Sequence, residues 1–402
     1  METKSVQQQY SYSVKFNYIS GSKSIEIEPS QISQILIDYD YDTKNMPIIY
    51  ITAKMDKAVM DDMLLNDNKN YVTLEIYKIL KNSTTKIPQI YIKDRFFYFM
   101  THDPNYTRDI EYKNSDPSKP VAQSNSYREV VIGLLKVDLL NINKRQLAGI
   151  WKNTQLINII AYYTMQMPTL IEPINDITFD GLIVPPCISV MQGLEFLNSV
   201  HCFYNTPFRY FLDFDKTYIV SSSGKATLAK GETVETIIIK ATDTDTDEGK
   251  VQGQIYNATE KVYIINVEAN QTSVFADKIT DKSYNAIVGI SVEGARIELP
   301  LNMNNNSLST KKTKLERIPN ENMNYINHLK KNIEAHSMIL QINKTDLDTS
   351  IFNINKSYSV KNFKTYSGLD GPFLLSRKRE IYLPDGDEFI MDTIINLRKI
   401  MS

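Results

Sequence analysis

The chain has 402 residues, of which 42% are hydrophobic and 23% are charged, and its formal net charge is -2. At roughly 100–200 residues per domain, this length predicts about two to four domains. The hydrophobic content is enough for stable cores without disulfides or metals. The nearly balanced charge argues against a general binder of nucleic acid or anionic membranes, because such proteins normally carry a basic excess or stripe.

The sequence carries no sign of export or of a membrane anchor. Its first residues lack an apolar core, so we expect no signal peptide. No apolar run reaches the roughly 18–20 residues of a spanning helix, so we expect no membrane-spanning segment and synthesis in the cytoplasm. The two cysteines, Cys187 and Cys202, lie in apolar surroundings and are expected to be buried, reduced thiols.

The first 112 residues are predicted to be mostly antiparallel strands. Apolar and polar residues alternate at 11–18, 33–41 and 71–80, which is the period of a strand, and a short helix is predicted at 55–65. Residues 89–92 and 96–100 are predicted to pair as a hairpin across Lys93-Asp94-Arg95. A small barrel or sandwich follows, because closure removes exposed strand edges.

Residues 114–126 are polar with two prolines and are predicted to form a linker or long loop. Residues 128–142 fit a strand or a helix equally well. The run 144–166, with Leu147, Ile150, Trp151 and Leu156 on one side, predicts a helix that ends before Pro168.

The most ordered stretch of sequence is 182–224. After Pro185-Pro186, apolar residues recur at three- and four-residue intervals, which predicts an amphipathic helix, and an aromatic hairpin follows around Asp215-Lys216. We expect the helix to lie on the hairpin as a packed core. Its defining positions are Val190, Leu194, Leu197, Tyr204, Phe208, Tyr210, Phe211, Phe214 and Tyr218.

The rest of the chain again predicts strands, at 236–241, 253–259, 262–269, 285–292 and 295–301. Residues 303–313 are of low complexity and predict a loop, 321–336 predict a helix, and 338–342 predict a strand. The segments 351–360, 380–383 and 388–400 complete the chain.

No motif predicts catalysis. Zinc-hydrolase, Walker and dinucleotide-binding motifs are absent from the sequence. Asp213 and Asp215 have a spacing that some inverting glycosidases use, but any pair two residues apart on a strand has it, so a hairpin tip is the favoured interpretation. We expect no catalytic residue, no metal and no cofactor.

Asp38, Asp40 and Asp42 alternate with tyrosines, so a strand would direct three carboxylates to one face about 7 Å apart. That spacing is too wide for one small ion without bending of the chain. A solvated strand face is the favoured interpretation.

The order of these segments resembles the tail-hub, or baseplate-hub, proteins of bacteriophages, which are related to the hub part of type VI secretion spike proteins. The resemblance is carried by PPCISVMQGLEFLNSV followed by HCFYNTPFRYFLDFDKTYIVSSSG, by Trp151-Lys152-Asn153 upstream, by ILIDYDYDTKNMPIIYITA near the N-terminus, and by FNINKSYSVKN at 352–362. It extends over most of residues 10–383.

The resemblance implies a predominantly β, α+β fold with two tube-protein-like antiparallel β-barrel domains, a mixed α/β domain and a small β domain. The expected divisions are 1–113 (tube-like barrel), 114–224 (mixed, with the central helix and aromatic hairpin), 225–315 (β) and 316–402 (a C-terminal segment that completes the second barrel).

The resemblance further implies a non-enzymatic virion protein at the baseplate. It would form a homotrimer that joins the six-fold tail tube above to the three-fold spike or tail tip below. Baseplate wedge proteins or a tape-measure protein are further candidate partners. DNA would pass through the lumen without sequence-specific binding, and Asp38, Asp40 and Asp42 would line that lumen and repel phosphates. The alternatives are a virion-associated cell-wall hydrolase or a receptor- or carbohydrate-binding tail-tip protein.

Overall fold

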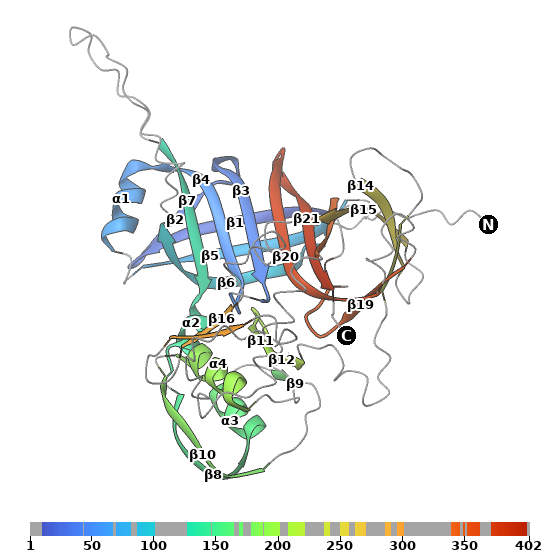
Figure 1. Ribbon diagram of the computed structural model, residues 1–402. Helices are drawn as coiled ribbons and strands as arrows, with labels where there is room; N and C mark the ends of the chain where they lie inside the picture. The colour runs from blue at the N-terminus through green and yellow to red at the C-terminus, as the bar shows by residue number, and fades with distance from the viewer. Residues whose placement is uncertain are drawn as a thin grey trace.

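The computed structural model describes residues 10–42, 44–66, 70–81, 87–100, 127–145, 147–164, 169–171, 178–187, 189–201, 208–221, 237–241, 250–256, 262–270, 286–290, 296–300, 339–345, 349, 352–361 and 371–399 (Figure 1). Strands dominate these residues, and the helices are few and short. The predicted fold class, α+β and predominantly β, is confirmed. None of the helices in the described ranges is long and apolar enough to cross a membrane.

Eight strands close into an antiparallel barrel in the order β21-β20-β3-β4-β7-β6-β5-β1. The ring closes where Tyr12 of β1 pairs with Phe389 of β21. The strands are β1 (Tyr10–Ser20), β3 (Ile32–Asp40), β4 (Ile48–Asp56), β5 (Tyr71–Leu80), β6 (Gln89–Met100), β7 (Tyr127–Lys136), β20 (Gly371–Asp385) and β21 (Glu388–Lys399), and β2 (Lys23–Ile27) pairs outside the ring with β1.

The hairpin predicted at Lys93-Asp94-Arg95 is wrong, because β6 runs through these residues without a turn. The tripeptide contains one aspartate, but it has no glycine or proline, whose backbone preferences impose a tight turn most strongly. Its side chains instead bind to neighbouring strands: Lys93 pairs with Glu75, Asp94 pairs with Lys136, and the Arg95 guanidinium lies 5.8 Å from the Tyr71 ring centroid.

Seven strands form a second closed circuit, in the order β19-β13-β14-β15-β18-β21-β20, completed by pairing of β19 with β20. All pairs are antiparallel except β13 with β19, which is parallel. The additional strands are β13 (Ile237–Ala241), β14 (Lys250–Tyr256), β15 (Val262–Asn270), β18 (Ile339–Thr345) and β19 (Ser357–Lys361).

The β20–β21 hairpin therefore belongs to both circuits. The eight-stranded barrel takes β7, β20 and β21 from beyond residue 113, so its strands come from three separate stretches of the chain. The division of the chain at 113, 224 and 315 stays a prediction. The helix predicted at 321–336 and the loop at 303–313 lie outside the described residues.

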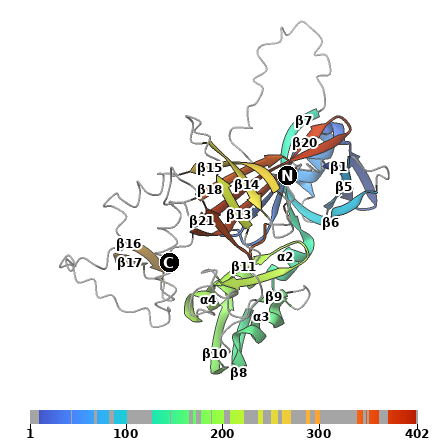
Figure 2. The ribbon, with the colours of Figure 1, turned by 90° about the vertical axis from the view of Figure 1, so that its right-hand side faces the viewer.

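The middle of the chain lies on one side of the barrel in both views (Figures 1 and 2). It contains two small sheets, β8 with β10 and β9 with β11 and β12, and the helices α2, α3 and α4. The bounds are α2 (Val137–Asn143), β8 (Leu147–Gln155), α3 (Leu156–Thr164), β9 (Thr169–Ile171), β10 (Thr178–Cys187), α4 (Val190–His201), β11 (Phe208–Leu212) and β12 (Thr217–Ser221). The pair β16 (Ala286–Ile290) and β17 (Arg296–Pro300) forms a separate ribbon.

The prediction of a single helix at 144–166 is correct only for its second half. Residues 147–155 form β8, and the helix begins at Leu156. Trp151 and Leu182 are opposite each other in the β8–β10 ribbon, so the apolar residues of this run are paired across strands. Asn153 has a φ of 46°, which a regular right-handed helix does not allow.

The barrel interior follows from strand alternation. Along β1, Val14, Phe16 and Tyr18 point into the core, and along β3, Ile35, Ile37 and Tyr39 do the same. The helix α1 (Lys57–Leu65) begins where the Asp56 carboxylate accepts a hydrogen bond from the Ala58 backbone, as an N-cap does.

Candidate functional site

The β11–β12 hairpin is buried on both of its faces. Phe211, Tyr218 and Val220 pack into the core of the barrel. Phe208, Tyr210 and Ile219 on the opposite face pack into a second core with α4. Of the positions predicted to define this region, Val190, Leu194, Leu197, Phe208, Tyr210, Phe211 and Tyr218 are buried, Phe214 is partly buried against the barrel core, and Tyr204 lies outside the described residues.

One buried asparagine fastens α4 to the hairpin. The Asn198 side-chain amide donates to the Phe208 carbonyl at 2.8 Å, and its oxygen accepts from the Phe208 backbone N–H at 2.8 Å. Phe208 is the first residue of β11, so these bonds satisfy a strand end that is removed from water. The helix and the hairpin are therefore joined by two buried hydrogen bonds as well as by their shared core.

The tip of the hairpin docks onto the barrel. The Phe214 ring packs edge-on against Tyr39 and Phe96, with centroid distances of 6.0 and 6.2 Å. The Phe214 carbonyl accepts a hydrogen bond from Lys136 Nζ at 2.5 Å, and the Leu212 N–H donates to the carbonyl of Asn45 at 2.8 Å. These contacts fix the tip to three strands of the barrel, β3, β6 and β7, and to Asn45 in the turn after β3.

Asp213 and Asp215 occupy the turn between β11 and β12, as the hairpin prediction requires. The Asp213 N–H donates to the Lys216 carbonyl, and its carboxylate accepts from the Phe214 N–H, both at 2.8 Å. Burial raises the pKa of Asp213 to about 6, against the opposing charge of Lys378. Asp215 is exposed. The Asp213 carboxylate is bound within its own turn, and Asp215 is exposed to solvent. This arrangement favours a structural role in the turn over a catalytic pair of carboxylates.

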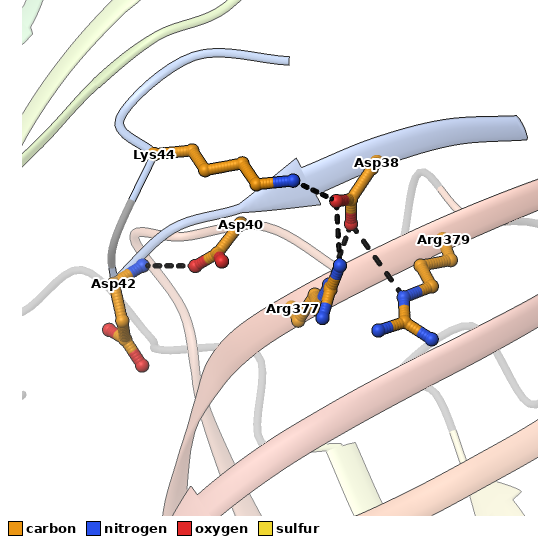
Figure 3. Close-up of polar contacts among 6 residues, drawn as sticks. All are labelled: Asp38, Asp40, Asp42, Lys44, Arg377 and Arg379. Atoms are coloured by element: carbon orange, nitrogen blue, oxygen red, sulfur yellow. Dashed lines mark hydrogen bonds and ion pairs between the residues drawn. The ribbon is translucent and has the colours of Figure 1, made fainter. Parts of the chain in front are cut away.

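Asp38 is the most heavily paired member of the acidic strand (Figure 3). Arg377 binds it through two hydrogen bonds, from Nε at 2.6 Å and Nη2 at 2.7 Å, and Lys44 Nζ adds a third at 2.7 Å. Burial alone would raise the pKa of Asp38, but the hydrogen bonds and charges of Arg377 and Lys44 outweigh it and hold that pKa below its ordinary value. The carboxylate is therefore a buried anion.

Asp40 and Asp42 have partners that differ from those of Asp38. The Asp40 carboxylate accepts from the Asp42 backbone N–H at 3.2 Å. The Asp42 side chain forms ion pairs with Arg209 at 3.3 Å and Arg398 at 3.2 Å, and Ser376 donates to it at 2.6 Å. Asp42 thus joins the barrel strand β21 to the hairpin strand β11.

The solvated strand face expected for these three residues is wrong for Asp38, whose side chain is only 1% exposed. Arginine and lysine side chains from β20 and the 41–47 turn cover it, because β20 is the neighbour of β3 in the barrel. Whether the strand lines a lumen stays a prediction, since a lumen belongs to an assembly of chains. Within the described part of the chain, no group of three or more His, Cys, Asp or Glu side chains is placed to hold a metal ion.

A second buried carboxylate was not expected from the sequence. Glu380 is fully buried in the barrel, where Tyr91 donates to its two oxygens at 2.7 and 2.8 Å and Lys378 Nζ lies 3.3 Å away. Tyr382 donates a further bond at 3.2 Å. Lys378 balances the charge of the carboxylate and the two tyrosines satisfy its oxygens, which is the pattern of a structural polar network.

The cations of the cluster were also missed. Arg377-Lys378-Arg379 precedes the short strand that was expected at 380–383, whereas β20 begins at Gly371. The alternation of side chains along an extended strand could have predicted which of these residues lie together. It places Arg377 and Arg379 on one face of the strand, and Lys378 and Glu380 on the other. That β3 is the partner of this strand could not be read from the alternation.

The family match relates the chain to bacteriophage proteins. Residues 1–400 match the model of the family described as Bacteriophage PBS1 gene 109 protein. No curated protein matches the chain. Among solved structures, the chain is similar to the tail protein from Neisseria meningitidis MC58 (12% identity, TM-score 0.46, 97% of each chain covered). It is also similar to the 43 kDa tail protein of prophage MuSo2 from Shewanella oneidensis (10% identity, TM-score 0.47, 96% of each chain).

A third similar structure is the Francisella PdpA–VgrG complex in its half-lidded form, at 9% identity and a TM-score of 0.41, covering 98% of this chain and 58% of that one. The family match spans nearly the whole sequence and confirms the expected kinship with bacteriophage proteins. The chain belongs to the Bacteriophage PBS1 gene 109 protein family.

Proposed function

We propose that this protein is a non-enzymatic structural component of a bacteriophage tail, a baseplate hub that joins the tail tube to the spike or tail tip. In this proposal three copies form a ring around a lumen through which DNA passes. The observation that carries the proposal is the presence of two closed strand circuits in one chain, joined by the β20–β21 hairpin. Three such chains would present six barrel-like units to a six-fold tube and three-fold symmetry to the spike.

Membership in a bacteriophage family supports a role in the virion. The rigid joint built from α4 and the β11–β12 hairpin supports the same proposal, because it ties the middle of the chain to the barrel through buried contacts on both faces. A symmetry adaptor needs such a joint, since its units must keep fixed relative orientations when they meet a tube.

Two measurements test the proposal. Sedimentation equilibrium of the purified chain is expected to give the mass of three copies. Electron microscopy of phage particles that carry a tagged copy is expected to place the label where the tube meets the spike. A strictly monomeric chain, or a label at the capsid or along the tail fibres, would contradict the hub. Release of muropeptides that is lost in the Asp213→Asn variant would favour the hydrolase instead.

A further inference from the structure

The charge cluster around Asp38 is not balanced. Lys44, Arg377 and Arg379 supply three positive charges, and Asp38 and Asp40 supply two negative ones. Arg377 and Lys44 take the hydrogen-bonding positions at Asp38, at 2.6 to 2.7 Å. Arg379 is the third cation, and its Nε lies 3.7 Å from the same carboxylate, beyond hydrogen-bond distance.

Arg379 is strained electrostatically by this position. Burial and the neighbouring charge of Arg377 together lower the pKa of Arg379. Among the described residues, its buried Nε has no hydrogen-bond partner. Arg379 is therefore partly desolvated, lies beside a like charge and makes no hydrogen bond from its Nε, and Asp38 and Asp40 attract it only as charges nearby. An additional anion near this group would relieve the imbalance.

The cations of the cluster are accessible, while its main anion is not. The side chains of Lys44, Arg377 and Arg379 are 31%, 29% and 33% exposed, against 1% for Asp38. Lys378 and Glu380 of β20 are buried and point into the core. Arg377 and Arg379 alternate with them along the strand, so these two arginines face away from the barrel interior. A molecule that approaches this face meets cations first.

We propose that this face of β3 and β20 is a protein-docking site, at which Arg379 binds a carboxylate side chain of a partner chain. A guanidinium matches a carboxylate in a planar, bidentate geometry, which favours this chemistry. A nucleic-acid partner fits less well, because the cluster has one net positive charge and DNA-binding faces neutralise about 6–10 phosphates. The inference is independent of the hub proposal, and its failure would leave the hub proposal standing.

The test uses the full-length chain, two probes and two variants. The probes are an N-acetylated, C-amidated tetraglutamate peptide and a duplex DNA, titrated calorimetrically at low salt. Arg379→Gln keeps much of the side chain's shape and removes its charge. Lys54→Gln is the matched control, because Lys54 is an exposed cation on the same outer side of the neighbouring strand β4. The peptide is expected to bind wild type and Lys54→Gln alike, and Arg379→Gln at least about five-fold more weakly.

Thermal unfolding of the same variants separates docking from a purely internal role. Arg379→Gln is expected to have an unchanged or higher Tm, because it removes repulsion with Arg377. A lower Tm would show that Arg379 is needed inside the chain to hold Asp38, and would overturn the proposal. Equal peptide binding by Arg379→Gln and wild type would overturn it too. Duplex DNA binding that depends on Arg379 and exceeds peptide binding would replace it with a nucleic-acid site.

Discussion

Arg209 and Asp42 connect the central hairpin to the barrel through a buried ion pair. Arg209 Nη2 lies 3.3 Å from Asp42 Oδ1, and the two side chains are 6% and 14% exposed. The same guanidinium donates to the Leu375 carbonyl of β20. A single arginine therefore links three elements that are more than 150 residues apart in sequence.

Loss of this arginine is expected to destabilise the protein. Arg209→Ala removes a buried positive charge from beside Asp42, which also contacts Arg398 and Ser376. We expect a decrease of about 3 kcal/mol in the free energy of unfolding, measured by urea denaturation. Lys152→Ala, an exposed lysine on β8, is the control and should change this free energy by less than about 0.5 kcal/mol. An Arg209→Ala variant as stable as this control would contradict the joint.

Asp38 is expected to be the most sensitive residue of the acidic strand. Asp38→Asn leaves Arg377 and Lys44 without their counter-charge, and we expect a loss of about 3–5 kcal/mol. The pKa of Asp38 is lowered in the folded state, so its ionisation stabilises the fold above the unfolded pKa of about 4, and this stabilisation disappears as the pH falls through the lower folded pKa.

The measurement for Asp38 is the difference in unfolding free energy between wild type and variant at a series of pH values. It should be constant above about pH 5 and should shrink below about pH 4. Glu26→Gln is the control, because Glu26 is an exposed carboxylate on β2, and its stability relative to wild type should not vary with pH in this way. A difference that grows in acid would contradict the ion cluster.

Asn198 is expected to couple α4 to the hairpin. Asn198→Ala leaves the buried N–H and carbonyl of Phe208 without their partners, so we expect a loss of about 2–4 kcal/mol. Hydrogen exchange should show faster opening of β11 in the variant. Gln192→Ala, at an exposed position on the same helix, serves as the control for changes in helix propensity. Unchanged protection of β11 would show that the helix is not fastened through this residue.

Asp213 is expected to give the opposite pH dependence from Asp38. Its folded pKa is about 6, above the unfolded value, so the folded protein binds this proton more tightly. The ionised carboxylate therefore destabilises the fold increasingly as the pH rises from about 4 past 6. Asp213→Asn is expected to be more stable than wild type by about 1–3 kcal/mol at pH 8 and equal to it at pH 4.

The control for Asp213 is Asp215→Asn in the same turn, because Asp215 is exposed. Its stability relative to wild type should not vary with pH in this way. Chemical denaturation at four or five pH values between 4 and 8 is sufficient. If Asp213→Asn were no more stable than wild type at pH 8, the Asp213 carboxylate would not be desolvated by the barrel.

Local pattern was sufficient for much of the secondary structure. The alternation in 71–80 predicted β5 with its correct bounds, and the three- and four-residue spacing after Pro186 predicted α4. These succeed because a strand or helix with one buried face must repeat its apolar residues at the period of its own backbone. The same reasoning predicted a single helix at 144–166, which is wrong for residues 147–155. Apolar residues there lie first on the strand β8 and then on the helix α3, so the two patterns run together.

What the sequence by itself determined, then, is the β-rich class, the central helix and the aromatic hairpin. Only the tertiary structure decided that β20 and β21 close the barrel begun by β1, and that Arg377 lies over Asp38 from 339 positions away. A strand's period specifies which face is buried but not which strand lies beside it, because backbone hydrogen bonds are the same for every partner. The pairing of Asp38 with Arg377, and with it the charge of this face, therefore arises only when the ring closes.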